Sequence, residues 1–107
     1  MSARARIRLP DSARIGDVIE IKTLIAHAME TGNRRNADGS VIPRLLLHTF
    51  EAWFAGREVF RASLHTGTAA NPFISFFMTV PGPGAFEFVW IEDGGAKITE
   101  RQALKLI

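Results

Sequence analysis

Short segments of strand character recur along this chain of 107 residues, with turn-forming residues between them. The first of them, residues 4–9, alternates strictly, with arginines on one side and Ala5, Ile7 and Leu9 on the other. Alternation of this kind has the period of a β-strand, in which successive side chains point to opposite faces of a sheet. No segment has a convincing helical pattern. The predicted strands are residues 4–9, 17–26, 45–54, 57–64, 72–80, 85–91 and 97–106.

Seven short strands separated by turns predict an all-β fold, namely an immunoglobulin-like antiparallel β-sandwich. The length suits a single domain over residues 1–107 with one hydrophobic core. Phe86, Phe88 and Trp90 lie on one face of their predicted strand, and Glu87 marks the opposite face. We therefore expect the three aromatic side chains to anchor the core between the two sheets.

The predicted strand that ends at Val80 is apolar on both faces, apart from Ser75 and Thr79. In a two-layer sandwich only one face of each strand meets the core, so the second apolar face needs a different partner. We expect that partner to be another protein, bound at an interface on this strand. The residues assigned to this interface are Phe73, Ile74, Phe76 and Met78.

Composition excludes several kinds of site and partner. The chain has no cysteine, so it cannot by itself supply a thiol nucleophile, a disulfide or the ligands of an iron–sulfur cluster. Its formal net charge is only +2, whereas nucleic-acid-binding domains usually carry a dense basic patch. No stretch approaches the roughly 20 apolar residues that span a bilayer. We therefore expect neither nucleic acid nor membrane as a partner.

Patterns typical of catalytic and metal sites are also missing from the sequence. His27, His48 and His65 lie in separate segments, so a metal site would require the fold to bring them together. No Gly-x-Ser-x-Gly nucleophile elbow occurs, and the turn at residues 81–84 lacks the lysine of a phosphate-binding loop. We predict no catalytic residue, no metal and no cofactor, and we do not expect an enzyme. A small metal-dependent enzyme that uses the histidines is the alternative.

The stretch from His27 to Arg35 replaces a strand-like pattern with polar and charged side chains, at the start of a long connection. Long connections in small domains are uncommon and often functional. Two interpretations stay open. The stretch is either a solvated loop or a binding loop, in which His27, Arg34 and Arg35 donate to an oxyanion while Met29 supplies an apolar contact.

The arginines of the first predicted strand, Arg4, Arg6 and Arg8, also allow two interpretations. They form either a cationic strip for an acidic partner or an anionic ligand, or an edge strand whose charges discourage pairing with another sheet. We favour the edge strand.

Several motifs resemble the SoxZ family, the small subunit of the SoxYZ carrier in bacterial sulfur oxidation. The resemblance runs from about Arg6 to the last predicted strand. At Leu64 and Phe73 this chain departs from the aromatic residue and the tyrosine that are common in the family, although both replacements are apolar. The motifs are Val18-Ile-Glu-Ile-Lys-Thr-Leu-Ile25, His27-x-Met29-Glu-Thr-Gly32-x-Arg34, Phe50-Glu-Ala, Ala70-Asn-Pro72 and Gly84-x-Phe-Glu-Phe-x-Trp-Ile91.

The resemblance implies a function that the residue patterns alone do not show. In that family's complex, the partner SoxY carries a flexible arm whose cysteine holds sulfur intermediates derived from thiosulfate. The resemblance therefore implies a non-catalytic subunit that forms a heterodimer with SoxY and presents this carrier arm to other Sox enzymes in transient contacts. We also expect the chain to associate with itself when SoxY is absent.

The location and the arm contact follow from the same resemblance. The N-terminus has no apolar segment typical of a secretory signal, and family members travel to the periplasm paired with SoxY. We expect periplasmic localisation by this route. We expect the rim of the cavity that receives the carrier arm to include His27, Met29, Glu30, Arg34 and Arg35. The alternative function is a generic immunoglobulin-like module that binds a ligand or another protein.

Overall fold

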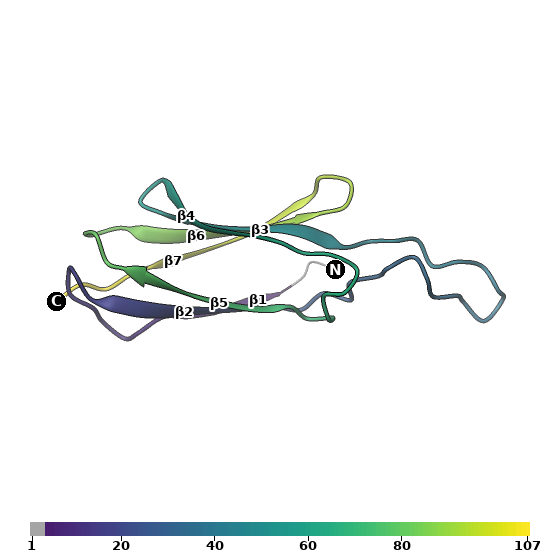
Figure 1. Ribbon diagram of the computed structural model, residues 1–107, viewed down its shortest axis with the longest axis horizontal. Coiled ribbons are helices and arrows are strands. Elements are labelled where there is room, and N and C mark those ends of the chain that lie inside the picture. The colour runs from purple at the N-terminus through teal and green to yellow at the C-terminus, as the bar shows by residue number, and fades with distance from the viewer. Residues whose placement is uncertain (1–3) are drawn as a thin grey trace.

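The computed structural model describes residues 4–107, which form seven strands in two antiparallel sheets stacked face to face (Figure 1). The small sheet has the order β1-β2-β5, and the large sheet has the order β4-β3-β6-β7. The predicted antiparallel β-sandwich is therefore confirmed. No helix within these residues is long and apolar enough to cross a membrane. The strands are β1 (Ala5–Arg8), β2 (Val18–Ile25), β3 (Leu47–Phe54), β4 (Arg57–Ser63), β5 (Phe73–Thr79), β6 (Ala85–Glu92) and β7 (Lys97–Ala103).

Aromatic side chains fill the space between the sheets. Phe86, Phe88 and Trp90 of β6 are fully or almost fully buried, so the predicted core face of this strand is confirmed. Phe60 of the large sheet stacks on Phe76 of the small sheet, with ring centroids 4.6 Å apart. Pairs of this kind contribute beyond the area that they bury. The aromatic core thus holds the two layers together.

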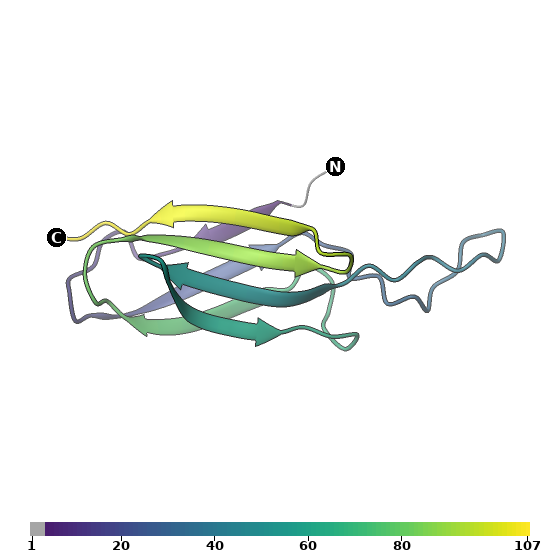
Figure 2. The ribbon, with the colours of Figure 1, turned by 90° about the horizontal axis from the view of Figure 1, so that it is seen from above.

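Between β2 and β3 the chain leaves the sandwich as a long two-stranded projection, which we call the finger, residues 30–45 (Figures 1 and 2). Backbone bridges join Glu30 to Leu45 and Arg35 to Val41. Because of this projection the molecule measures 58 × 24 × 21 Å. The long connection predicted from the sequence is therefore an ordered element that extends well beyond the core.

A close approach at the root of the finger requires a glycine. Gly32 has a φ of +87°, and a Cβ atom at this position would lie 3.2 Å from the Cβ of Arg44 on the opposite leg. Only glycine adopts such a backbone conformation at little cost and also leaves this space free. The two legs can therefore run side by side from the start.

Substitution of Trp90 tests whether its face of β6 belongs to the core. Its indole is fully buried, and its Nε1 has no hydrogen-bond partner among the described residues. Trp90→Ala should lower the free energy of unfolding by about 3–5 kcal/mol, because truncating a large aromatic side chain leaves a cavity. Trp90→Phe should cost less, since it keeps an aromatic ring and removes no hydrogen bond. Denaturant unfolding measures both, and wild-type stability of Trp90→Ala would contradict the assignment.

Candidate functional site

The imidazole of His27 forms hydrogen bonds with two residues of the domain at the root of the finger. The Met29 N–H donates to Nδ1 of His27 at 2.9 Å, so Nδ1 carries no proton and Nε2 is the protonated nitrogen. Nε2 then donates to the Glu92 carboxylate at 2.8 Å. Met29 itself is buried in the core, where its sulfur accepts a hydrogen bond from the Leu47 N–H. Both side chains therefore position the finger and are turned away from solvent.

Asp93, the next residue after Glu92, holds the returning leg of the finger. Its carboxylate accepts hydrogen bonds from the Leu46 N–H and from Nε of Arg44, each at 3.0 Å. The backbone donor and then the arginine lower the pKa of Asp93 below its ordinary value. Glu92 binds the outgoing leg through His27, so this pair of carboxylates clamps both legs. The sequence predicted only a turn at these residues.

The charged residues assigned to the arm cavity lie along the finger. Arg34 forms an ion pair with Glu30 at 3.1 Å. Arg35 lies further along and donates to the Gly39 carbonyl at 2.9 Å. Both arginines are largely exposed, whereas the side chain of His27 is only 7% exposed. The five predicted residues therefore extend from the domain interior along the finger and do not surround one cavity.

The predicted interface strand β5 turns its residues to two different sides. Phe76 is buried in the core, and Ile74 and Met78 pack against that core. Phe73 and Phe77 both point outward, and they are 60% and 69% exposed, respectively. The assignment of Ile74, Phe76 and Met78 is thus corrected, because these side chains cover the inner face. Phe77 was missed, although Ser75 and Thr79 mark its face as the outer one.

The surface of the small sheet that is turned away from the core is hereafter the outer face. Arg6, Leu24 and Phe73 form one cross-strand row on it, and Arg8 and Lys22 are paired in the next row. The face thus grades from cationic residues on β1 to aromatic residues on β5. Its members are Arg6, Arg8, Val18, Glu20, Lys22, Leu24, Phe73, Ser75, Phe77 and Thr79.

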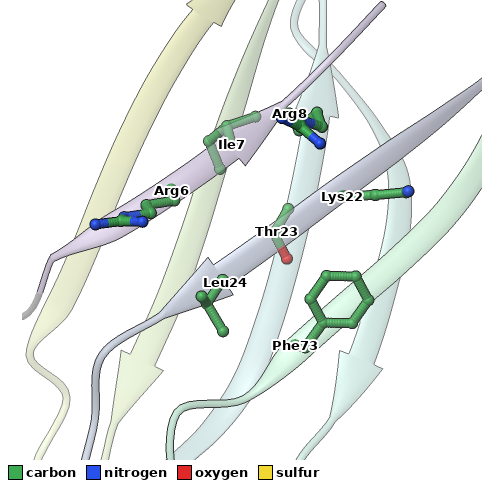
Figure 3. A pocket seen from close by; sticks show the side chains of 7 residues that line it. All are labelled: Arg6, Ile7, Arg8, Lys22, Thr23, Leu24 and Phe73. Carbon is green, nitrogen blue, oxygen red and sulfur yellow. The ribbon is translucent and has the colours of Figure 1, made fainter.

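A hollow of about 500 Å³ opens on this face, lined by Leu24 and Phe73 together with three cationic residues (Figure 3). Figure 3 shows that the charged ends of Arg6 and Lys22 extend to opposite sides. Their charges therefore do not converge on one point, as they would around a small ion. The arrangement suits a broad partner surface that carries both apolar and anionic groups.

The two sheets differ in how far the charged side chains on their outer surfaces form ion pairs. On the large sheet, Arg61 donates to both Glu51 and Glu58 at 2.8 Å, and Arg101 forms an ion pair with a glutamate of β6. On the small sheet, Lys22 pairs with Glu20 at 3.7 Å, but neither Arg6 nor Arg8 forms an ion pair with any residue in the range 4–107. Free cations beside exposed aromatic rings are typical of an interaction surface.

The histidines do not form a metal site in the part of the chain that the structure covers. Within residues 4–107 no group of three or more histidine, aspartate or glutamate side chains is placed to hold a metal ion. His27 is bound to Glu92, His48 Nδ1 lies 2.8 Å from the Thr49 hydroxyl, and His65 Nδ1 accepts a backbone hydrogen bond in its own turn. The outer face and the finger are therefore the candidate functional surfaces.

Comparisons with known proteins identify a matching family and solved structures of similar fold. The family model described as "Sulphur oxidation protein SoxZ" matches residues 7–103. Three structures of superoxide reductase (neelaredoxin) from Ignicoccus hospitalis, two of them of substituted forms, superpose with TM-scores of 0.73 to 0.75. They are 14% identical, and the alignments cover 96% of this chain and 79–80% of theirs, so the likeness shows the fold alone. No curated protein matches the chain by sequence.

The hydrogen bonds of Asp93 predict that the stability of the fold decreases in acid. Because the folded state lowers the pKa of this carboxyl, the unfolded state binds more protons in acid. The stabilisation is therefore present at neutral pH and is lost as the pH falls through about 4 toward the lowered pKa. Asp93→Asn should be less stable than wild type at neutral pH and lose less stability on acidification.

Chemical unfolding at a series of pH values measures this effect. Asp11→Asn is the control, since Asp11 is exposed and makes no such contact within the described range. Equal pH dependence of wild type and Asp93→Asn would contradict the clamp.

Proposed function

The chain belongs to the SoxZ family of sulphur oxidation proteins, and from this premise we propose that it is the non-catalytic subunit of a SoxYZ sulfur carrier. The match covers residues 7–103, which include the finger, all of β2 to β7 and the second half of β1. A role in sulfur oxidation follows from the family. The proposal adds that the chain pairs with SoxY and presents its carrier arm to the other Sox enzymes.

The absence of cysteine supports this division of labour. Without a thiol, the chain cannot hold a sulfur intermediate as a persulfide or an S-sulfonate. In the proposal the cysteine of SoxY carries the intermediates derived from thiosulfate. A second thiol close to that arm would be able to trap it as a disulfide, and this chain offers none.

The outer face is the proposed binding surface for SoxY in the heterodimer. Phe73 and Phe77 expose most of their aromatic rings, and burying one such side chain contributes about 1.5–3 kcal/mol. Arg6 and Arg8 lie on the same face and have no ion-pair partner among the described residues, so they can pair with carboxylates of SoxY. The combination of free cations and exposed aromatics is the single observation that favours pairing here.

The finger is the proposed contact for the carrier arm. Arg34 and Arg35 are exposed on it beyond the sandwich, where they can donate to an anionic sulfur group on the arm. Such a charge-assisted bond contributes about 1.5–3 kcal/mol when the bound arm partly shields it from water, so one or two bonds still allow the arm to leave. His27, Met29 and Glu30 lie at the root of the finger and would support this contact by positioning it.

In this proposal the chain acts in the periplasm and is exported together with SoxY. A generic immunoglobulin-like binding module is the alternative function. The outer face would serve either function, because exposed aromatic rings beside cations fit many protein surfaces. Binding to SoxY therefore decides between the two.

Phe77→Asp tests the heterodimer surface. An aspartate at this position should weaken binding to SoxY at least tenfold, since the interface loses an aromatic anchor and gains a desolvated charge. Thr99→Asp on β7 is the matched control, because it places the same charge at an exposed strand position of the large sheet. Titration of purified SoxY measures both affinities. Wild-type affinity of Phe77→Asp would contradict pairing through the outer face.

Replacing both finger arginines separates assembly from handling of the arm. Arg34→Ala/Arg35→Ala should keep the affinity for SoxY, since the finger lies away from the outer face (Figures 1 and 2). The variant should lower thiosulfate-dependent turnover in a reconstituted Sox system. Unchanged turnover with an intact heterodimer would show that the finger does not contact the carrier arm.

A further inference from the structure

Strand β5 leaves an edge of the small sheet open. It pairs with β2 on one side, and no strand among the described residues pairs with it on the other. The residues that face outward on this strand are Phe73, Ser75, Phe77 and Thr79. Each of them is exposed, so the edge and the aromatic part of the outer face coincide.

The same four residues also present the free backbone groups of the edge. The Ile25 N–H donates to the Pro72 carbonyl, and the Val80 N–H donates to the Asp17 carbonyl. In an antiparallel ladder the residues that bond to a neighbour alternate with residues that do not. Every even-numbered position from 72 to 80 therefore faces β2. The N–H and C=O groups of Phe73, Ser75, Phe77 and Thr79 point toward the open edge.

Edge strands usually carry charges, prolines or bulges that prevent pairing with another chain. Among the four edge strands that residues 4–107 form, β5 is the one without a charged side chain, and it contains no proline. Its inner residues and its outward rings also favour an extended conformation. The charged residues of the other edges are Arg6 and Arg8 on β1, Arg57, Glu58 and Arg61 on β4, and Lys97, Glu100 and Arg101 on β7.

A strand that adds to this edge must be uncharged, extended and open at its own edge. β5 of a second copy meets all three requirements. We propose that two copies of this chain join through antiparallel pairing of their β5 strands, so that the two small sheets become one continuous sheet. This joint is independent of the proposed function, since it requires no SoxY.

Twofold symmetry sets the register of the joint. With the axis at Phe76, Phe73 lies opposite Thr79 of the second copy, and Phe77 lies opposite Ser75 of the second copy. Every outward backbone group then falls in a hydrogen-bonded pair, with Cα atoms about 5.5 Å apart. The two Phe77 rings are diagonal neighbours, within reach of one another across the axis.

The charges of the outer face allow this arrangement. Arg6 and Arg8 belong to β1, which is two strands away from β5 and so about 10 Å from the joint. Lys22 lies on the strand between them, next to Glu20, its nearest acidic group at 3.7 Å. No like charges therefore oppose each other where the copies meet.

Ser75→Lys tests the joint, because a lysine at an exposed edge position blocks pairing while its side chain remains in solvent. Sedimentation of the purified chain from low to high micromolar concentration measures its self-association. Wild type should shift from monomer to dimer, and Ser75→Lys should weaken the dimer at least tenfold. Thr99→Lys on β7 is the matched control and should dimerise like wild type.

Amide hydrogen exchange separates strand pairing from contact through side chains alone. In the dimer the amides of Phe73, Ser75, Phe77 and Thr79 should exchange more slowly than in the monomer. A wild-type chain that stays monomeric at every concentration overturns the proposal. So does a dimer that Ser75→Lys leaves intact or that does not protect these amides. Because Phe77 also lies near this joint, SoxY binding is titrated at concentrations at which the chain alone is monomeric, so that the two tests can fail separately.

Discussion

A sheet in a two-layer sandwich can bury only one of its faces. The two sheets of this chain differ in the side chains that they place on the other, solvent-facing side. The aromatic core, which includes the stacked rings of Phe60 and Phe76, occupies the space between the layers, so only the inner face of each sheet is buried. The large sheet covers its outer surface with internal ion pairs such as those of Arg61. The small sheet instead exposes Phe73 and Phe77 on the face that also carries Arg6 and Arg8, which form no ion pair within residues 4–107. The candidate partner surface is thus a consequence of how the layers are stacked.

The finger depends on a second, more local constraint. A two-stranded ribbon gains little stability by itself in water, so a projection of this length needs a firm root. Glu92 and Asp93 supply that root, since one binds His27 on the outgoing leg and the other binds Arg44 and the Leu46 N–H on the returning leg. The exposed arginines further along are therefore held at a distance from the sandwich by contacts at the root, of which those to His27 and to the Leu46 N–H are partly buried.

Strand positions and the core face of β6 could be predicted from the sequence, because alternation along a strand reports which side of a sheet is buried. The same rule fails at β5, where apolar residues occupy both sides and only Ser75 and Thr79 distinguish them. The pattern therefore assigns Phe76 to the interface and omits Phe77, whereas the structure buries Phe76 and exposes Phe77. The clamp at Glu92 was invisible for a different reason, since it joins residues that are 65 positions apart. Long-range contacts of this kind leave no local pattern.

In our proposal this subunit meets SoxY through the outer face of the small sheet. Hydrogen–deuterium exchange distinguishes this surface from the others, when the chain is compared as a monomer at low concentration and in complex with purified SoxY. Complex formation should slow exchange in β5 and in the neighbouring β2, while β7 on the opposite layer should exchange at an unchanged rate. Protection confined to β4 and β7, with β5 unchanged, would contradict the account.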